Sequence, residues 1–505
     1  MWDEKIEELE ARREKAYNGG GQARIDKQHE KGKLTARERL DVLFDEGTFV
    51  EINSLMESRC IDFGMPKKKI PGDGVVTGYG KVNGRVVFAS SQDFTVGGGA
   101  LGEYHARKIC NAMDMAMDAR APFVEINDSG GARIEEGIDS LNGYALMFRR
   151  HTQMSGVAPQ IAVIMGPCAG GACYAPALCD YIFMTQENGQ MYLTGPKVIK
   201  EVTGEVVTTS ELGGAEVHMN NSGVAHFVYP DDESCLEGVK RLLSYLPENF
   251  EEKAPYVEPV KKYYHKRLRD IVSPNPKVSY DMHEIIEELA DKDTFMEVQS
   301  GFAKNIIVGF MRMEGHTVGV VANQPEFMAG SLDYNAGDKG GRFIRFCDCF
   351  NIPILTLVDV PAFLPGIRHG AKLLYAYSEA TVPMVTVILR KAFGGAYIGM
   401  DSKGIGADFV FAWPIAQIAV MGAEGAVNII AKRKIEESED PEAARAEAIA
   451  EYENKFMNPY IAASRGYVDE VIKPDETKER VVKAFDMLSQ KNRVKIPKKH
   501  GNMPV

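Results

Sequence analysis

Apolar and polar residues follow two different spacings along the chain. Largely apolar runs follow Pro159 and Pro383, and such runs are typical of strands that are buried on both faces. Residues 103–119 and 372–380 instead have the pattern of amphipathic helices. Strands that alternate with helices predict an α/β fold built in layers, with loops that can hold a ligand.

The same order of elements occurs twice. Residues 75–92 are matched by residues 307–324, and each segment reads as two strands joined by a glycine-containing turn. Two spacings between matching residue types are also equal in the two copies. They are 38 residues (Gly84 to Pro122, and Gly315 to Pro353) and 11 residues (Pro159 to Gly170, and Pro383 to Gly394). Equal spacings of this kind are not expected by chance, so we predict an internal duplication.

A stretch rich in proline and charge, residues 250–272, separates the two copies. With 505 residues, the chain is also too long for one ordinary hydrophobic core. We therefore expect an N-terminal domain over residues 1–255 and a C-terminal domain over residues 260–495.

Composition argues against several classes of protein. The net charge of −12 disfavours general binding of nucleic acid. The eight cysteines form no CxxC pair and have no histidines at zinc-ligand spacing, so we expect free thiols in a reducing compartment and no metal site. The sequence shows no apolar signal-peptide core and no apolar stretch long enough for a bilayer. These features predict a cytoplasmic protein without direct membrane insertion.

Two glycine-rich turns occupy matching places in the two copies. Residues 165–172 and residues 391–397 each follow a buried strand and precede a helix. Paired glycines let backbone N–H groups approach a ligand oxygen closely, and the helix adds the positive end of its dipole. Two N–H groups directed at one oxygen form an oxyanion hole, which stabilises an enolate without an ionisable side chain. Tight packing of strand on helix would explain one such turn, but two symmetric turns favour function.

A third loop, Asn127 to Gly137, also follows a buried strand. Its glycine N–H groups and Arg133 offer a site for an anionic acyl-CoA. The alternative is a helix cap made by Asp128 and Ser129 together with a structural arginine. The residues alone leave both alternatives open.

Several strings in the chain resemble the acyl-CoA carboxyltransferase family, which includes propionyl-CoA carboxylase β subunits, methylmalonyl-CoA decarboxylase α subunits and the central subunit of transcarboxylase. The strings are SQDFTV (91–96), NDSGGARI (127–134), MGPCAGGA (165–172), RFIRFCD (342–348), IRHGAKLLYA (367–376), GGAY (394–397) and VMGAEGA (420–426). The resemblance extends from Arg24 almost to the C-terminus. It implies two crotonase-like domains, each a ββα spiral, in a ring-shaped hexamer.

The resemblance also implies roles for the site residues. The N-terminal domain would bind the acyl-CoA, and the C-terminal domain would bind biotin. Backbone oxyanion holes would hold the thioester oxygen at Gly170 and Gly171, and the biotin ureido oxygen at Gly395 and Ala396. The remaining contacts would be made to acyl-CoA by Gly130, Gly131, Ala132, Arg133 and Ala169, and to biotin by Phe363, Gly394 and Tyr397. The chain lacks the biotin-attachment sequence Ala-Met-Lys-Met, so biotin must arrive on a partner, a biotin carboxylase or biotin carboxyl carrier subunit.

The loop after the strand that ends near Val360 departs from the family pattern. Pro122 and Pro159 are 37 residues apart, but Pro353 and Pro383 are only 30 apart, so this loop is 7 residues shorter than its counterpart. In addition, Ala362 replaces the usual glycine, and its Cβ disfavours a positive φ angle. We hypothesise that the short loop opens or reshapes the biotin or acyl pocket.

Substrate choice is predicted at Ile398. An apolar residue after Gly-Gly-Ala-Tyr makes the chain more similar to methylmalonyl-CoA decarboxylases and transcarboxylases. We therefore favour propionyl-CoA and methylmalonyl-CoA as substrates. Two alternatives remain. One is a crotonase-type hydratase or isomerase without biotin, which needs a positioned Glu or Asp base that neither glycine turn supplies. The other is a catalytically impaired assembly subunit, because of the shortened loop at residues 366–367.

Overall fold

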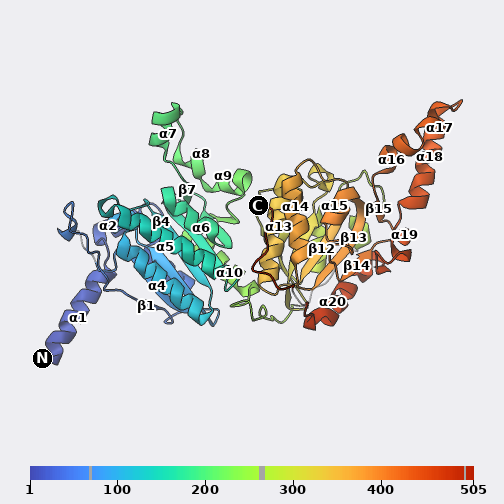
Figure 1. Ribbon diagram of the computed structural model, residues 1–505. Helices are drawn as coiled ribbons and strands as arrows, with labels where there is room; N and C mark the ends of the chain where they lie inside the picture. Colours follow the sequence, from blue (N-terminus) through green and yellow to red (C-terminus); the bar gives the residue numbers. More distant parts are fainter. Residues whose placement is uncertain (68–70, 261–267, 494–495) are drawn as a thin grey trace. The chain divides into compact units, whose positions relative to one another are not determined.

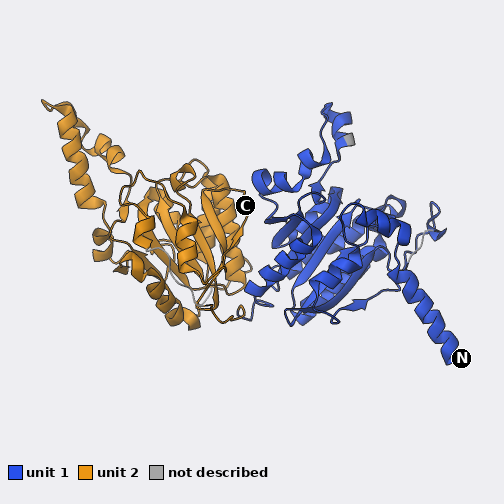
Figure 2. Ribbon diagram, turned by 180° about the vertical axis from the view of Figure 1, so that it is seen from behind, with its two compact units in different colours: residues 1–253 blue, residues 254–505 orange. Residues whose placement is uncertain are grey.

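The computed structural model describes residues 1–67, 71–260, 268–493 and 496–505. They form two compact units, Met1–Lys253 and Ala254–Val505 (Figures 1 and 2). Within the predicted linker, residues 261–267 lie outside the described residues. Each unit has a mixed sheet covered by helices, so the predicted α/β class is confirmed.

The sheet of unit 1 begins antiparallel and continues parallel. Its order is β1-β2-β3-β4-β5-β6-β8, and β7 pairs with the last part of β5. The pairs β1–β2 and β2–β3 are antiparallel, and every later pair is parallel. The strands are β1 (Val50–Ile52), β2 (Val75–Val82), β3 (Arg85–Gln92), β4 (Phe123–Ser129), β5 (Gln160–Ala169), β6 (Tyr181–Thr185), β7 (Gln190–Tyr192) and β8 (Phe227–Tyr229).

The sheet of unit 2 has the same topology, read from its other end. Its order is β16-β14-β13-β12-β11-β10-β9, and β15 pairs with the last part of β13. The pairs β9–β10 and β10–β11 are antiparallel, and the pairs from β11–β12 onward are parallel. The strands are β9 (Met296–Val298), β10 (Ile306–Met313), β11 (His316–Asn323), β12 (Ile354–Val360), β13 (Met384–Phe393), β14 (Phe409–Ala412), β15 (Gln417–Ala419) and β16 (Glu470–Val471).

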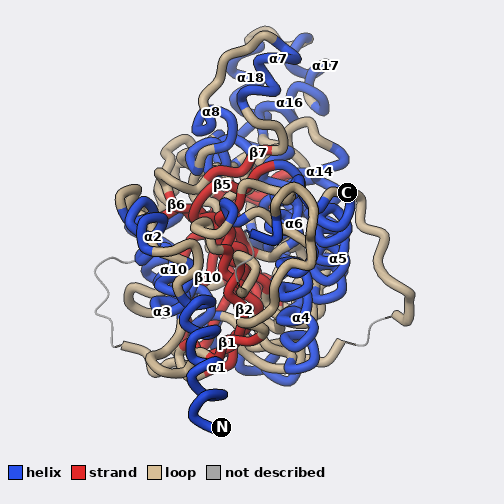
Figure 3. The backbone as a smooth tube through the Cα atoms, turned by 90° about the vertical axis from the view of Figure 1, so that its left-hand side faces the viewer, coloured by secondary structure: helices blue, strands red, loops and turns tan. Residues whose placement is uncertain are grey.

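Helices cover the faces of each sheet. In unit 1, α4 and α5 pack together on one face, while α3 and α10 lie on the other (Figure 3). In unit 2, α13 packs against α14, as α4 packs against α5. The helices of unit 1 are α1 (Trp2–Tyr17), α2 (Gln22–His29), α3 (Ala36–Leu43), α4 (Glu103–Ala119), α5 (Ile138–Met154), α6 (Tyr174–Leu178), α7 (Pro196–Thr203), α8 (Thr209–Gly213), α9 (Ala215–Val217) and α10 (Asp232–Tyr245). Those of unit 2 are α11 (Leu268–Ile271), α12 (Met282–Leu289), α13 (Tyr334–Cys349), α14 (Ile367–Glu379), α15 (Gly394–Gly399), α16 (Ala423–Ile430), α17 (Lys432–Glu436), α18 (Pro441–Phe456), α19 (Pro459–Ser464) and α20 (Thr477–Met487).

In both units the chain leaves the layers after the short strand beside the glycine turn. The segment α7–α9 follows β7, and α16–α18 follows β15; each projects from its own unit (Figure 1). Both segments carry exposed apolar side chains: Val198, Val202, Val206, Ile429 and Ile430. Exposed apolar side chains gathered on a projecting segment are typical of a surface that contacts another protein.

The hairpins that open the two sheets are built alike. Asn83 and Gly84 both have positive φ, as type I′ turns require, and Gly315 occupies the second of these positions in unit 2. The carboxylate of Asp45 accepts both N–H groups of the first turn, and that of Asp291 accepts both N–H groups of the second. One residue type therefore fixes the hairpin turn in both units, although it precedes the turn by 38 residues in unit 1 and by 23 in unit 2.

A matched ion pair joins the first helix to the first strand of each repeat. In unit 1 the guanidinium of Arg37 lies 2.7 Å from Glu51. In unit 2 the equivalent residue is His283, whose ring nitrogens lie 3.0 Å from Glu297 and 2.7 Å from Asp281. The hydrogen bond to Glu297, helped by Asp281, raises the pKa of His283 to about 9. The same contact is thus permanently charged in unit 1 and titratable in unit 2.

Unit 2 should therefore lose stability as pH rises from about 6.5 to about 9. The folded pKa of His283 is raised, so its stabilisation is complete below the unfolded value near 6.5 and disappears as pH passes the folded value near 9. Since these side chains are partly exposed, we expect a loss of roughly 1–2 kcal/mol after solvent screening. Urea unfolding at pH 6 and pH 9 measures it. His283→Arg should remove this dependence, and a variant with an unchanged pH slope would contradict the assignment.

Candidate active site: two glycine turns

The acyl-side turn lies at the end of β5. Gly170 has a φ of +65°, which lets the chain turn out of the strand into a short 3₁₀ segment, Gly170–Cys173, and then into α6. No atom lies within 4 Å of the place where a Cβ on Gly171 would stand. The first N–H groups of a helical segment have no partner inside it. The turn therefore presents backbone donors next to open space.

The second turn, at the end of β13, repeats this geometry. Gly394 has a φ of +57°, and Gly395 has open space at its Cβ position, as Gly171 has. Ala396 is buried, as is its structural counterpart Ala172. The repeat thus places Gly171 and Gly395 at equivalent positions. The predicted pairs of N–H donors, Gly170 with Gly171 and Gly395 with Ala396, therefore differ by one position between the two units.

Aromatic side chains lie beside the second turn. The ring of Phe363 would be 3.1 Å from a Cβ on Gly370 and 3.6 Å from one on Gly399, so it packs between α14 and α15. Tyr397 is partly buried within α15, and this burial raises its pKa. Ile398 is 48% exposed, so its apolar side chain is available to a ligand.

The loop after β4 is held by its own neighbours. Ala132 pairs with Leu101, and the N–H of Gly130 donates to the carbonyl of Gly98. The N–H of Gly131 donates to Ser129 Oγ. The buried guanidinium of Arg133 lies 2.7 Å from both Asp73 and Glu136, and it also donates to two carbonyl groups. Because these partners neutralise its charge inside the protein, the structure favours the structural role for Arg133.

The shortened loop after β12 is closed in the same manner. Leu332 pairs with Phe363: the N–H of Leu332 donates to the carbonyl of Ala362, and the N–H of Leu364 donates back. Ala362 is not among the residues with positive φ, so the expected conflict with its Cβ was wrong. The loop reaches α14 after only six residues, 361–366.

Sequence reasoning missed a buried ion cluster behind each turn. Asp128, at the end of β4, lies 3.0 Å from Arg39 and 2.6 Å from Lys33. Its counterpart Asp359, at the end of β12, lies 2.9 Å from Arg390. The only signal in the sequence is a carboxylate at the same place in two equivalent strands, FVEINDS and ILTLVDV.

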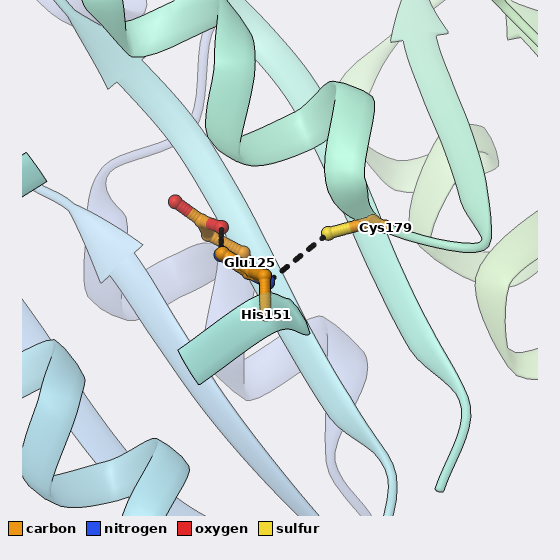
Figure 4. Close-up of side chains that lie close together, drawn as sticks. All are labelled: Glu125, His151 and Cys179. Carbon is orange, nitrogen blue, oxygen red and sulfur yellow. Dashed lines mark hydrogen bonds and ion pairs between the residues drawn. The ribbon is translucent and has the colours of Figure 1, made fainter. Parts of the chain in front are cut away.

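A second buried cluster lies far from the turns. His151 Nε2 is 3.1 Å from Glu125, and His151 Nδ1 is 3.7 Å from Cys179 Sγ (Figure 4). His151 Nδ1 is also 2.9 Å from Gln160 Oε1. Gln160 donates its amide N–H to the carbonyl of His151, so its oxygen faces the ring. Burial opposes charge on the ring, but Cys179 and Glu125 together raise the pKa of His151 well above its ordinary value.

The raised pKa of His151 favours a protonated ring that forms an ion pair with Glu125. A metal ligand needs a deprotonated ring nitrogen, so a raised pKa of His151 favours an ion pair over a metal site here. Gln160 begins β5 and Gly170 follows its end, about 30 Å away at the usual rise per residue. The Gln160 contact of this cluster therefore lies at the opposite end of β5 from the glycine turn.

Comparison with known proteins identifies the family. Residues 27–503 match the carboxyl transferase domain. The chain is 55% identical to methylmalonyl-CoA decarboxylase subunit alpha of Propionigenium modestum, with 99% of each chain covered. It is 54% identical to the carboxyltransferase subunit of propionyl-CoA carboxylase from Haloferax mediterranei, covering 100% of this chain and 99% of the relative. That alignment spans 513 positions, eight more than this chain has residues, so the relative contains residues that this chain lacks.

The solved structure of transcarboxylase 12S, described as a hexamer with methylmalonyl-CoA bound, has the same fold. It is 51% identical, with a TM-score of 0.97, and covers 99% of this chain and 98% of the other. The predicted crotonase-like duplication is thereby confirmed. The chain belongs to the carboxyl transferase family. It is an enzyme of the class found in biotin-dependent acyl-CoA carboxylases and decarboxylases, as its motifs predicted.

Within the described ranges, 1–67, 71–260, 268–493 and 496–505, no helix has the length and apolar character needed to cross a bilayer.

Proposed function

We propose that this chain transfers a carboxyl group between methylmalonyl-CoA and biotin, and that a partner subunit carries the biotin. The observation that supports this most directly is the pair of matching glycine turns. Gly171 and Gly395 present their backbones to open space at the ends of equivalent strands, one in each unit. Two oxyanion sites suit a reaction in which two different carbonyl groups develop negative charge.

On the acyl side, the N–H groups of Gly170 and Gly171 would hold the thioester oxygen. When the carboxyl group leaves methylmalonyl-CoA, the remaining α-carbon becomes enolate-like and the charge moves to that oxygen. Preorganised N–H donors stabilise this charge more than the neutral thioester, which is the condition for catalysis. The loop at Gly130–Arg133, together with Ala169, would border the acyl-CoA. Since the side chain of Arg133 is paired with Asp73 and Glu136, the loop would contact the ligand through its backbone.

On the other side, the second turn fits a ureido ring. Gly395 has no neighbour within 4 Å of its Cβ position, and Phe363 and Tyr397 supply aromatic surface near it. The N–H groups of Gly395 and Ala396 would hold the ureido oxygen, while Gly394 permits the turn. Biotin, when bound, accepts or supplies the carboxyl group; the chain orients the ring and polarises its oxygen.

The acidic side chains near the turns argue against a hydratase or isomerase. Asp128 and Asp359 are buried and paired with cations, so neither is placed as a general base. Asp401 follows α15, and burial raises its pKa to about 7, but the carboxylate is fully buried and accepts a hydrogen bond from Thr386. A base must reach the substrate proton within hydrogen-bond distance.

Ile398 supports a small branched acyl group. Carboxyl transfer requires the acyl α-carbon to meet the biotin ring that the second turn would hold. The exposed apolar side chain of Ile398 follows that turn directly, so it would contact a methyl substituent on this carbon more favourably than water does. One such contact is worth roughly 1–3 kcal/mol, so methylmalonyl-CoA should be preferred over malonyl-CoA by about 10- to 200-fold.

We further propose a hexamer, as described for transcarboxylase 12S, and a biotin carboxylase or biotin carboxyl carrier subunit as partner. The exposed apolar side chains on α7 and α16 support contacts between subunits. The backbone pairing of the short loop with Leu332 favours an active enzyme over an impaired assembly subunit.

Carboxyl transfer from methylmalonyl-CoA to free biotin tests the proposal, with malonyl-CoA compared alongside. We expect transfer with preference for methylmalonyl-CoA. If a folded oligomer binds acyl-CoA but transfers nothing, lengthening the loop at residues 366–367 by the missing 7 residues should restore activity. Failure of both proteins would refute the proposed function.

A further inference from the structure

A left-handed turn follows the strand β3 in unit 1 and its counterpart β11 in unit 2. The residues Gly97–Gly99 all have positive φ angles, between +60° and +67°. In unit 2 the same places are taken by Met328, Ala329 and Gly330, with φ angles of +53°, +53° and +80°. The register of β3 on β4 and of β11 on β12 makes these positions equivalent. The two units therefore build one backbone turn from different side chains.

Packing requires glycine only at the third position of this turn. A Cβ on Gly99 would lie 2.1 Å from the carbonyl oxygen of Asp128, and Gly330 is confined in the same way. No described atom lies within 4 Å of the Cβ position of Gly97, and only one, at 4.0 Å, lies near that of Gly98. The first two positions in unit 1 therefore have room for side chains that they do not carry.

Unit 2 carries side chains at these two positions in spite of strain. Among the described residues, Met328 and Ala329 are the only adjacent non-glycine residues that both have positive φ. A Cβ in this conformation approaches the following carbonyl oxygen too closely and costs free energy. Met328 is 51% exposed, and Ala329 is exposed as well, so burial of the side chains does not offset this cost. Strain that packing does not repay points to a role in function.

The turn lies on the ligand side of each sheet. The strands β3, β4 and β5 are parallel, so their carboxyl ends share one edge, as do those of β11, β12 and β13. In unit 1 the carbonyl of Gly98 accepts the N–H of Gly130 at 3.0 Å. The next residue, Gly131, has its Cβ position 3.1 Å from the carbonyl oxygen of Ala169, directly before the acyl-side turn. The left-handed turn is thus two strands, about 10 Å, from the glycine turn of its unit.

We propose that the side chains of Met328 and Ala329 close unit 2 to acyl-CoA, and that the bare turn at Gly97–Gly98 leaves unit 1 open to it. This inference rests on the proposed function, in which each glycine turn holds a carbonyl oxygen of a different ligand. Because the two turns are alike, they do not themselves tell one ligand from the other. The residues around them must make this distinction.

The chemistry of the two ligand arms explains how the turn selects. The pantetheine arm of acyl-CoA contains two amide groups, whereas the arm of biotin next to its ring is an alkyl chain. The thioether side chain of Met328 offers apolar contact, which suits the alkyl chain and leaves an amide without a hydrogen-bond partner. The exposed backbone at Gly97 instead leaves space for the amide-bearing arm.

Placing the unit 2 residues in unit 1 tests this assignment by binding. Gly97→Met/Gly98→Ala should raise the Kd of methylmalonyl-CoA by about 10-fold or more and raise its KM equally, with an unchanged KM for free biotin. The variant should fold, because unit 2 builds the same turn with these side chains. Gly47→Met is the matched control. Gly47 also has a positive φ, +71°, and open space at its Cβ position, but it precedes β1, at the opposite edge of the same sheet. The control should leave the Kd unchanged.

The reverse exchange gives a readout that a structural role would not produce. Met328→Gly/Ala329→Gly should fold as wild type, because glycine adopts this φ without strain. Isothermal titration of the full chain with methylmalonyl-CoA should then show two sites per chain in place of one. In the transfer assay, methylmalonyl-CoA should now compete with free biotin.

An unchanged Kd in the first exchange, or a single site per chain in the second, would overturn the inference. It would also be overturned if Gly47→Met weakened binding as much as the exchange does, because strain alone would then explain the loss. A wild-type chain that binds no methylmalonyl-CoA would refute the proposed function, and this inference with it. A wild type that binds and transfers, with exchanged variants that behave identically, would refute this inference alone.

Discussion

Replacing Gly171 or Gly395 by alanine should abolish most carboxyl transfer and leave the fold intact. Neither residue has a positive φ, and no atom lies within 4 Å of either Cβ position, so the chain itself accommodates the methyl group. Glycine to alanine in a helical turn stabilises a protein by up to about 1 kcal/mol. The new methyl group would occupy the space that a ligand oxygen must enter. We expect kcat/KM to fall by about 10²-fold or more while Tm stays the same or rises.

Gly404→Ala is the matched control for both variants. Gly404 also has open space at its Cβ position and no positive φ, but it lies outside the two turns. It should leave both Tm and the transfer rate unchanged. Alanine variants at Gly171 and Gly395 with wild-type rates would show that the open space is not where the substrates bind.

Arg39→Met should strongly destabilise unit 1, because Arg39 pairs with Asp128 at the end of β4. The fully buried guanidinium donates to Asp232 at 2.8 Å, to Asp128 at 3.0 Å and to the carbonyl of Met165 at 3.2 Å. Although burial opposes its charge, these two carboxylates raise the pKa of Arg39. Removing one partner of a buried ion cluster leaves uncompensated charge and costs roughly 3–5 kcal/mol. Urea unfolding measures this cost as a shift in midpoint.

An exposed arginine provides the comparison. Arg433 pairs with Glu437 at 2.7 Å, but its side chain is 88% exposed, so Arg433→Met should change stability by less than about 0.5 kcal/mol. If Arg39→Met and Arg433→Met cost the same, the buried cluster does not stabilise the end of β4.

The architecture could be predicted from the sequence because the two copies keep equal spacings between matching glycines and prolines. Gly84 and Gly315 mark hairpins that the structure confirms, and Pro159 and Pro383 directly precede β5 and β13. Both glycine turns lie where the pattern placed them, at the ends of those strands. These features are local, since each depends on residues within one strand and the turn that follows it.

What the sequence could not predict depends on side chains that meet from distant segments. Arg39 reaches Asp128 from 89 positions away. In unit 2 the arginine comes instead from β13, because Arg390 stands where unit 1 has Gly166. A Cβ on Gly166 would lie 1.9 Å from Asp128 Oδ1, so this glycine leaves room for the cations of the N-terminal segment. The two copies thus neutralise the same carboxylate by different routes, which no spacing reveals.

Arg133 shows the same limit at the candidate site. Its place in a glycine-rich loop suggested a contact with an anionic ligand. In the structure the carboxylate of Asp73, 60 positions earlier in the chain, neutralises the charge of Arg133. Residue type and spacing identify which loops meet at the strand ends. They do not tell which charges remain unpaired there.

The most direct test of the account is whether consumption of methylmalonyl-CoA depends on biotin. With the carboxyl carbon labelled, propionyl-CoA formed and label recovered on free biotin should appear in equal amounts, and neither should form when biotin is omitted. Propionyl-CoA appearing at the same rate without biotin, or hydration of an unsaturated acyl-CoA by the same chain, would contradict the assignment of the two glycine turns to carboxyl transfer.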